Sequence, residues 1–175
     1  HSPGGFFFDA KGNKYNCGDG IFADLSIFSF HPVKHIACGE GGMITTNSKK
    51  SYDKLLNLRT HGITKNKIFF NNSIAESGGN NEYPNWYMEM QSLGFNYRLT
   101  DIQAALGISQ LKRAKKGLEK RNKIAEIYYD NFKNKKYILG QSGYIEGHAY
   151  HLYIIEVENR LELYNFLREN KIFAQ

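Results

Sequence analysis

The sequence predicts an α/β fold, because strand-like runs alternate with helical segments along most of its length. Runs rich in aromatic and β-branched residues are typical of strands. In two places such a run is followed by a segment whose apolar residues recur every three or four positions, as in an amphipathic helix. With 175 residues, 41% of them hydrophobic, the chain has the length of one domain or two small ones.

The first unit begins with a predicted hairpin over residues 4–20, whose turn lies at Gly12 and Asn13. Residues 22–30 and 41–47 are predicted to be two further strands, on either side of a glycine-rich turn. Ser48 is suited to cap a helix that follows and that Gly62 ends.

The second half contains a long helix and a second strand-helix unit. Residues 63–92 are rich in Asn and Gly and show neither periodicity, so we expect a long loop that is either a functional flap or a disordered insertion. Thr100 and Gln103 form a capping box at the start of a helix that runs to residue 132. Residues 148–157 then predict a strand and residues 160–170 a helix.

Composition excludes several classes of protein. The formal net charge of +6 suits an anionic ligand but is common on lysine-rich surfaces. Cys17 and Cys38 form no zinc motif, no metal site is expected, and reduced thiols fit a cytoplasmic protein. No secretory segment and no apolar run of about 20 residues is present, so no membrane partner is expected. The ends of the sequence predict a fragment of a longer protein.

Lys34 stands out because it lies between an apolar strand and a glycine-rich turn, in SFHPVKHIACGEGG over residues 29–42. A phosphate-binding P-loop needs its lysine after the glycines, which is not the order here. Two interpretations remain open. The lysine is either solvated in a turn, or a desolvated amine that reacts with a carbonyl, as in proteins that bind pyridoxal phosphate as a Schiff base. A rigid strand end and the nearby Ser29 hydroxyl fit the second.

Three ordered motifs resemble the DegT/DnrJ/EryC1/StrS family of sugar aminotransferases. They are SFHPVKHIACGEGGMITTN, LRTHGI and GFNYRLTDIQAALGISQL, and AYHLYIIEV resembles the strand that opens the family's small domain. The resemblance implies part of a type I pyridoxal-phosphate-dependent transferase fold. Residues 1–115 would be the C-terminal portion of the large cofactor-binding domain, with the 63–92 insertion. Residues 116–175 would be the linking helix and the beginning of the small domain.

The resemblance also implies the activity. The motifs are most similar to those of one branch of the family. Enzymes of this branch move the amino group of glutamate to C4 of a UDP-linked 4-keto-6-deoxy-N-acetylhexosamine, for surface glycans such as pseudaminic acid. Another nucleotide-4-keto-sugar aminotransferase of the same family is the alternative. The cofactor would be pyridoxal 5'-phosphate, and the expected assembly is a homodimer with a shared active site.

Family positions assign the site residues one by one. Lys34 would hold the cofactor covalently, and Ser29 would bind its phosphate. His1 would lie on the cofactor ring, and Asn96 would reach the cofactor phosphate of the neighbouring subunit. The family's aspartate that contacts the pyridine nitrogen would precede His1. It is therefore absent, and we expect this fragment alone to be inactive.

A rival from another class is a polyanion-binding module built on the basic stretch KRAKKGLEKRNK, residues 112–123. This stretch lacks interleaved aromatic residues, and lysines spread over several helix faces are more often simply solvated. Nucleic acid is therefore not the expected partner.

Overall fold

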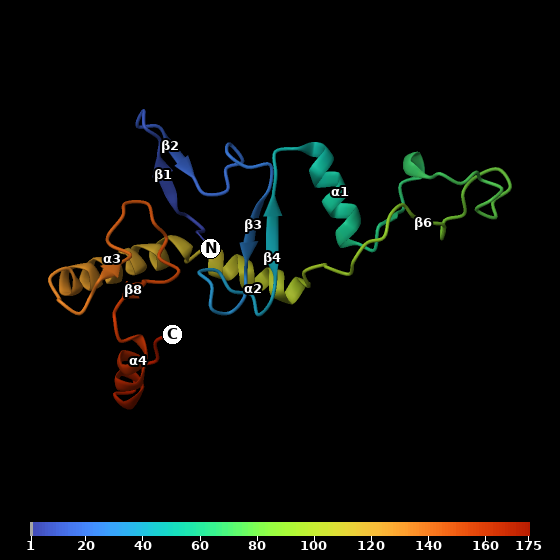
Figure 1. Ribbon diagram of the computed structural model, residues 1–175. Coiled ribbons are helices and arrows are strands. Elements are labelled where there is room, and N and C mark those ends of the chain that lie inside the picture. Colours follow the sequence, from blue (N-terminus) through green and yellow to red (C-terminus); the bar gives the residue numbers. More distant parts are fainter. Residues whose placement is uncertain (1) are drawn as a thin grey trace.

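The computed structural model describes residues 2–175, and helices and strands alternate along it (Figure 1). The strands form four separate two-stranded antiparallel sheets. The pairs are β1 (Phe6–Phe8) with β2 (Lys14–Asn16), β3 (Ser26–Ser29) with β4 (Gly42–Thr45), β5 (Ile63–Thr64) with β6 (Glu89–Met90), and β7 (Gly140–Gln141) with β8 (Ile155–Glu156). The helices are α1 (Lys49–Arg59), α2 (Asp101–Leu111), α3 (Ala114–Phe132), α4 (Arg160–Glu169) and the 3-10 turn η1 (Lys67–Phe69).

The first unit follows the sequence prediction closely. In the β1–β2 hairpin, Asp9 Oδ1 accepts hydrogen bonds from the backbone of Lys11 at 2.8 Å and of Asn13 at 2.9 Å, which closes the turn. The glycine-rich turn joins β3 to β4, as expected. Ser48 caps α1, its hydroxyl accepting from the Ser51 N–H at 3.2 Å.

The capping box at Thr100 is confirmed, but the long helix is two helices. Thr100 Oγ1 accepts from the Gln103 N–H at 3.3 Å, and Gln103 Oε1 accepts from the Thr100 N–H at 3.1 Å. The expected helix over residues 100–132 breaks at residues 112–113, where the Arg113 N–H bonds to the Gln110 carbonyl, a tighter turn than α-helical. Neither Gly107 nor Gly117 marks the break.

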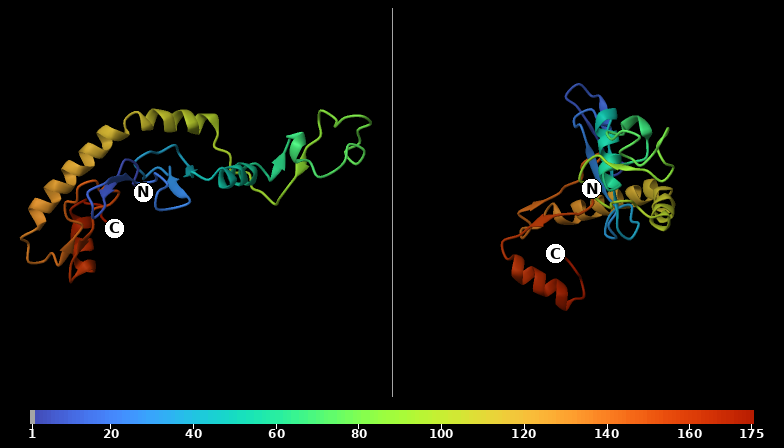
Figure 2. Two further views of the ribbon diagram at one scale, coloured as in Figure 1. Left: turned by 90° about the horizontal axis from the view of Figure 1, so that it is seen from above. Right: turned by 90° about the vertical axis from the view of Figure 1, so that its right-hand side faces the viewer.

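Residues 63–92 form an ordered arm rather than an open loop, and we call them the arm. Its two ends pair as β5 and β6, so that Ile63 lies opposite Met90. The arm projects from the end of α1, away from β3 and β4 (Figures 1 and 2). Sequence periodicity did not reveal this pairing, because each strand has only two residues.

In the second unit the predicted helix is present as α4, but the predicted strand over residues 148–157 is mostly wrong. Only Ile155 and Glu156 are in strand, and residues 148–154 have no regular secondary structure, with a φ of 45° at Tyr150. Tyr150 is itself buried, and its hydroxyl donates to the Gly143 carbonyl at 3.0 Å. Part of this apolar run is therefore buried as irregular backbone.

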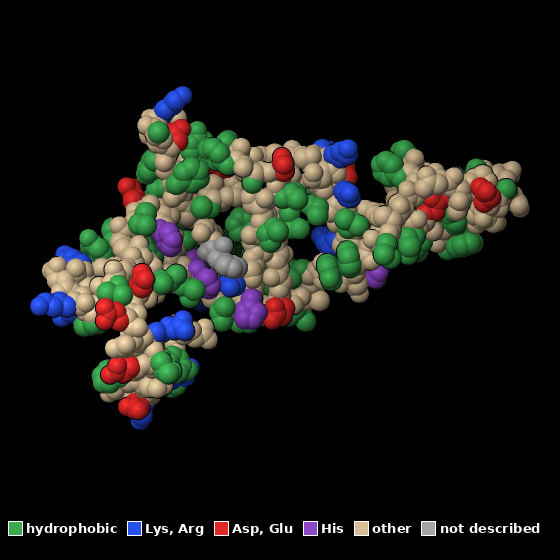
Figure 3. Space-filling view, in the orientation of Figure 1, with side chains coloured by type: hydrophobic (Ala, Val, Ile, Leu, Met, Phe, Trp, Pro, Cys, Tyr) green, Lys and Arg blue, Asp and Glu red, His purple; other side chains and the backbone are tan. Residues whose placement is uncertain are grey.

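The molecule is open rather than compact. Its accessible surface is 13558 Å², whereas a compact monomer of 20.1 kDa would expose roughly 8,700 Å². Apolar side chains are spread over the whole visible face, the arm included (Figure 3). Among the described residues the buried apolar set is small: Ile36, Cys38, Ala125, Ala149 and Tyr150.

Candidate active site

The candidate site is built on the turn of residues 30–41 between β3 and β4, which we call the Lys34 turn. The Phe30 N–H donates to the Gly41 carbonyl at 2.8 Å, and the Cys38 N–H donates to the Phe30 carbonyl at 3.0 Å. Within the turn, the Lys34 N–H donates to the His31 carbonyl at 2.9 Å. These bonds continue the β3–β4 ladder, so the backbone that carries Lys34 is held in one place.

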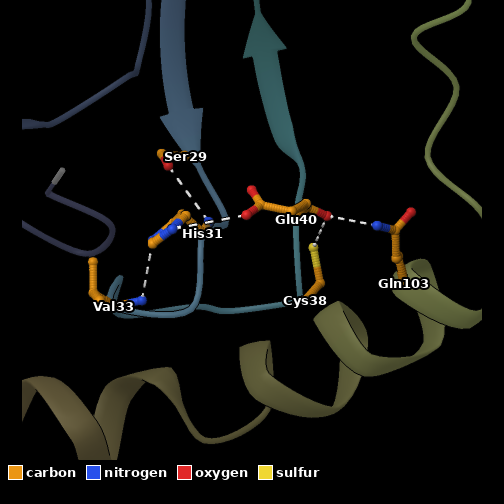
Figure 4. Close-up of polar contacts among 6 residues, drawn as sticks. All are labelled: Ser29, His31, Val33, Cys38, Glu40 and Gln103. Carbon is orange, nitrogen blue, oxygen red and sulfur yellow. Dashed lines mark hydrogen bonds and ion pairs between the residues drawn. The ribbon is translucent and has the colours of Figure 1, made fainter.

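Ser29 and His31 lie at the entrance to the Lys34 turn (Figure 4). The His31 N–H donates to Ser29 Oγ at 3.4 Å, and the Val33 N–H donates to His31 Nδ1 at 3.4 Å. His31 Nε2 lies 3.7 Å from Glu40 Oε1 on the other side of the turn. This ion pair is exposed, so its contribution is local order rather than much stability.

Helix α2 supports the turn from below. Gln103 Nε2 donates to the Glu40 carbonyl at 2.9 Å, and Cys38 Sγ contacts the same oxygen at 3.3 Å (Figure 4). Burial, with Glu40 nearby, raises the pKa of the Cys38 thiol, so Cys38 is a packing group and not a nucleophile. Gln103 thus caps α2 and also anchors the turn.

The amine of Lys34 points toward the second unit. Lys34 Nζ lies 3.3 Å from Nε2 of His151, which is 117 positions away in the sequence. Both side chains are half-buried. The sequence predicts a strand around His151, and none of its motifs marks His151 as a site residue.

Arg121 on α3 binds the backbone at His151. Its Nη1 donates to the Tyr150 carbonyl at 2.9 Å and to the His151 carbonyl at 3.4 Å. Arg121 therefore points into the molecule, unlike Lys115, Lys116 and Lys120 on the same helix, which are exposed. The basic stretch thus does not act as one uniform cationic surface.

His35 packs beside this group. Its ring centroid lies 5.9 Å from that of His151, and its buried Nε2 has no hydrogen-bond partner among the described residues. Burial, followed by the charge of Arg121, lowers the pKa of His35 to about 4. His35 is therefore neutral near pH 7, and Arg121 supplies positive charge beside it.

Of the other two predicted site residues, only Asn96 lies in the described part of the chain. Asn96 is exposed and forms an antiparallel bridge with Thr60, at the end of α1. His1 lies outside the described residues. The structure therefore brings Lys34 and Ser29 to the same turn and places Asn96 with the base of the arm.

The residues that form this arrangement match a known protein family. The model of the DegT/DnrJ/EryC1/StrS aminotransferase family matches residues 9–175. The chain belongs to this family. The match includes the Lys34 turn, α2, α3 and the segment that carries His151, so all the contacts to Lys34 described above lie within it.

Individual members of the DegT/DnrJ/EryC1/StrS family are similar over most of the chain. The UDP-4-amino-4,6-dideoxy-N-acetyl-beta-L-altrosamine transaminase of Campylobacter jejuni is 42% identical over 118 residues, which are 67% of this chain and 27% of that protein. The chain thus spans about a quarter of that relative's length. It spans a little more than a third of each of two similar solved structures.

Both of these solved structures are described as aminotransferases. PseC of Helicobacter pylori, an aminotransferase involved in the biosynthesis of pseudoaminic acid, has 31% identity and a TM-score of 0.62, covering 87% of this chain and 37% of PseC. Spr1654 of Streptococcus pneumoniae in its PLP-form has 26% identity and a TM-score of 0.64, with the same two coverages. The chain is therefore part of a pyridoxal-phosphate-dependent sugar aminotransferase fold, as its motifs predict.

Sequence reasoning missed Arg121, His35 and His151 because no local pattern distinguishes them. Arg121 is one of many cations in its stretch, and the two histidines are far apart in the sequence. The predicted strand over residues 148–157, which contains His151, is the wrong local structure. Only contacts in the structure mark these residues, because His151 contacts Lys34 while Arg121 and His35 contact His151.

Proposed function

We propose that the full-length protein is a pyridoxal-phosphate-dependent aminotransferase that moves the amino group of glutamate to C4 of a UDP-linked 4-keto-6-deoxy-N-acetylhexosamine. The observation that carries the proposal is the half-buried Lys34 amine, held on an anchored turn within a chain that matches the aminotransferase family. The choice of sugar rests on the similarity to the Campylobacter transaminase and to PseC.

The residues present fit the cofactor. A primary amine that can form a Schiff base lies near a strand-end hydroxyl, Ser29, that can donate to a phosphate. Arg121 gives this region positive charge, which favours an anionic ligand. Pyridoxal phosphate supplies the electron sink of the reaction, while the protein supplies binding and orientation.

Each site residue then has a role in the proposal. Lys34 Nζ would hold the cofactor covalently and, once free, would accept the proton from Cα of glutamate. Ser29 would bind the phosphate, and His1 would contact the cofactor ring. Asn96, at the exposed base of the arm, reaches the cofactor phosphate of a second subunit, so that a homodimer shares its sites.

The overall reaction balances without an external oxidant. The amino group and two electrons leave Cα of glutamate, which becomes 2-oxoglutarate, and sugar C4 changes from a ketone to an amine. Water consumed in one half of the reaction is released in the other. An enzyme that uses glutamate and a nucleotide sugar would work in the cytoplasm, and within residues 2–175 no helix has the length and apolar character to cross a bilayer.

The test uses the full-length protein supplied with pyridoxal phosphate. We expect visible absorbance that disappears on borohydride reduction, is absent from Lys34→Ala, and is unchanged in Lys50→Ala, where an exposed lysine on α1 is removed. Colour that survives in Lys34→Ala would refute the assignment of Lys34.

The substrate is tested separately. UDP-linked 4-keto sugars of different C5 stereochemistry are supplied with glutamate, and 2-oxoglutarate is measured. We expect the 6-deoxy-N-acetylhexosamine substrates to give the fastest turnover. Faster turnover with another nucleotide-4-keto sugar would assign the protein to a different branch of the same family. Salt-sensitive binding to arbitrary DNA without turnover would instead support the polyanion-binding alternative.

A further inference from the structure

We propose that His151 is a positioning residue that holds the Lys34 amine whenever this amine is not bonded to the cofactor, and that Arg121 places His151 for this task. The inference rests on the proposed function. It adds two residues from the second unit to a site that the sequence motifs locate in the first.

Lys34 and His151 are joined by one hydrogen bond between Lys34 Nζ and His151 Nε2, at 3.3 Å. An ammonium group donates hydrogen bonds and has no acceptor, so a neutral His151 ring can accept this bond through Nε2. The surroundings agree, because burial and then the charges of Lys34 and Arg121 lower the pKa of His151.

Hydrogen bonds from two side chains hold the backbone at and before His151. Arg121 Nη1 bonds to the carbonyls of Tyr150 and His151, so the guanidinium fixes two consecutive peptides. Tyr150 is 4% exposed, and the His148 ring, 4.4 Å from it, accepts the Tyr150 N–H through Nδ1 at 3.0 Å. A side chain on such a backbone can hold a partner in one position.

Holding the amine matters because a lysine side chain has four rotatable carbon bonds. A free amine at the end of this chain samples many positions, and displacement of a reacting group by about 1 Å can cost roughly a hundredfold in rate. One hydrogen bond from a fixed ring restricts Nζ to the side of the turn that faces the second unit. The contact thus selects among Lys34 rotamers without touching the substrate.

Arg121 and Lys120 make a matched pair for the experiment. They are neighbours on α3 and both cationic, but only Arg121 contacts the His151 backbone, whereas Lys120 is exposed.

The experiment measures the single-turnover rate of the reaction of glutamate with the full-length, cofactor-loaded protein. We expect His151→Ala to keep the borohydride-sensitive absorbance but to react roughly ten- to a hundredfold more slowly at saturating glutamate, with half-saturation changed less than threefold. His151→Gln, whose amide oxygen can accept from Lys34, should recover part of the rate. Arg121→Gln should be slowed in the same way, and Lys120→Gln should match the wild type.

The outcomes separate this inference from the proposed function. Wild-type protein without the borohydride-sensitive absorbance would refute the function itself. Normal absorbance with a His151→Ala rate within twofold of wild type would refute only the positioning role. Should His151→Ala fail to fold, His151→Gln still decides: a rate no better than that of Lys34→Ala would contradict a role that an amide acceptor can replace.

Discussion

Two glycines let the chain reverse its direction after Lys34. Gly39 and Gly41 have φ angles of 84° and 148°, which side-chain-bearing residues rarely adopt. A Cβ on Gly41 would also lie 2.8 Å from Leu99 Cδ1 and 3.0 Å from Cys38 Sγ. The glycines therefore meet a backbone and packing requirement of the turn, and the chemistry is left to Lys34.

The buried His35 should make stability depend on acidity. Its pKa is about 4 in the folded protein against 6.5 for a free histidine, so between these values the unfolded state binds more protons. We expect the free energy of unfolding to fall as the pH is lowered from 6.5 to 4, because His35 is protonated more readily in the unfolded protein than in the folded one. Urea unfolding of the full-length protein at several pH values measures this.

A His35→Asn variant provides the control for that dependence. Without a titrating ring at this position, the slope of unfolding free energy against pH should become shallower between pH 6.5 and 4. An unchanged slope would show that other groups, and not His35, cause the acid sensitivity.

At the scale of elements, the arm is organised by one carboxylate. Glu89 is 7% exposed and accepts four hydrogen bonds, two of them from the backbones of Asn71 and Asn72 at 2.6 and 2.9 Å. The hydroxyl of Tyr87 and the amide of Gln91 supply the others, each at 2.9 Å. Such a network gives an Asn-rich segment a defined conformation without a hydrophobic core.

Replacing Glu89 should loosen the arm. In Glu89→Gln one carboxylate oxygen becomes an NH2 group that faces the backbone N–H of either Asn71 or Asn72, so that donor loses its acceptor. We expect faster hydrogen exchange in residues 63–92, while α2 and α3 keep the wild-type rate. Glu82→Gln, at an exposed position of the arm, is the control, and equal protection in both variants would contradict the role of Glu89.

The same network predicts how the arm responds to acid. Burial by itself raises the pKa of Glu89, but the hydrogen bonds from Asn71, Asn72, Tyr87 and Gln91 outweigh it and lower the pKa below 4.5. Stability from a carboxylate of lowered pKa is present above the unfolded value and is lost as the pH falls through the folded one. Acid should therefore loosen the arm of the wild-type protein in the same way as Glu89→Gln.

Gly117 in α3 offers a stabilising substitution. A Cβ at this position would meet no atom within 4 Å, and the residue is helical. Gly117→Ala should therefore raise the free energy of unfolding by about 0.5–1 kcal/mol, because alanine loses less backbone entropy in a helix. Urea unfolding of the full-length protein measures the change, and a loss of stability would show that another segment packs against Gly117.

Gly62 is the contrasting case. It has a φ of 68°, and a Cβ there would lie 1.8 Å from the Ser92 carbonyl oxygen. Gly62→Ala should destabilise the base of the arm, where the Gln91 N–H donates to the Gly62 carbonyl at 2.6 Å. In urea unfolding, Gly117→Ala should therefore raise the free energy of unfolding and Gly62→Ala should lower it.

At the scale of the whole molecule, the exposed apolar surface predicts how residues 1–175 behave alone. Leu93 and Ile68 are each 85% exposed, and Ile102 is 84% exposed. Surfaces of this kind are normally covered by other parts of a protein or by a partner. We expect the isolated chain to bind the dye ANS, to self-associate in sedimentation experiments and to show no transamination, whereas a monomeric, dye-free chain would contradict this.

The sequence alone determined the family, the alternation of helices and strands, the α2 capping box and the importance of Lys34. These features depend on residues close together in the chain, such as the Gly-Glu-Gly-Gly run after Lys34 or the Thr100–Gln103 pair, so local patterns reveal them. The break between α2 and α3, the pairing inside the arm and the approach of His151 to Lys34 were decided only by the tertiary structure. The arm pairing and the His151 contact depend on residues that are distant in the sequence, and the break depends on which backbone hydrogen bonds form at residues 112–113. The physical reason is that packing and backbone hydrogen bonds select among conformations that local propensity leaves nearly equal in energy.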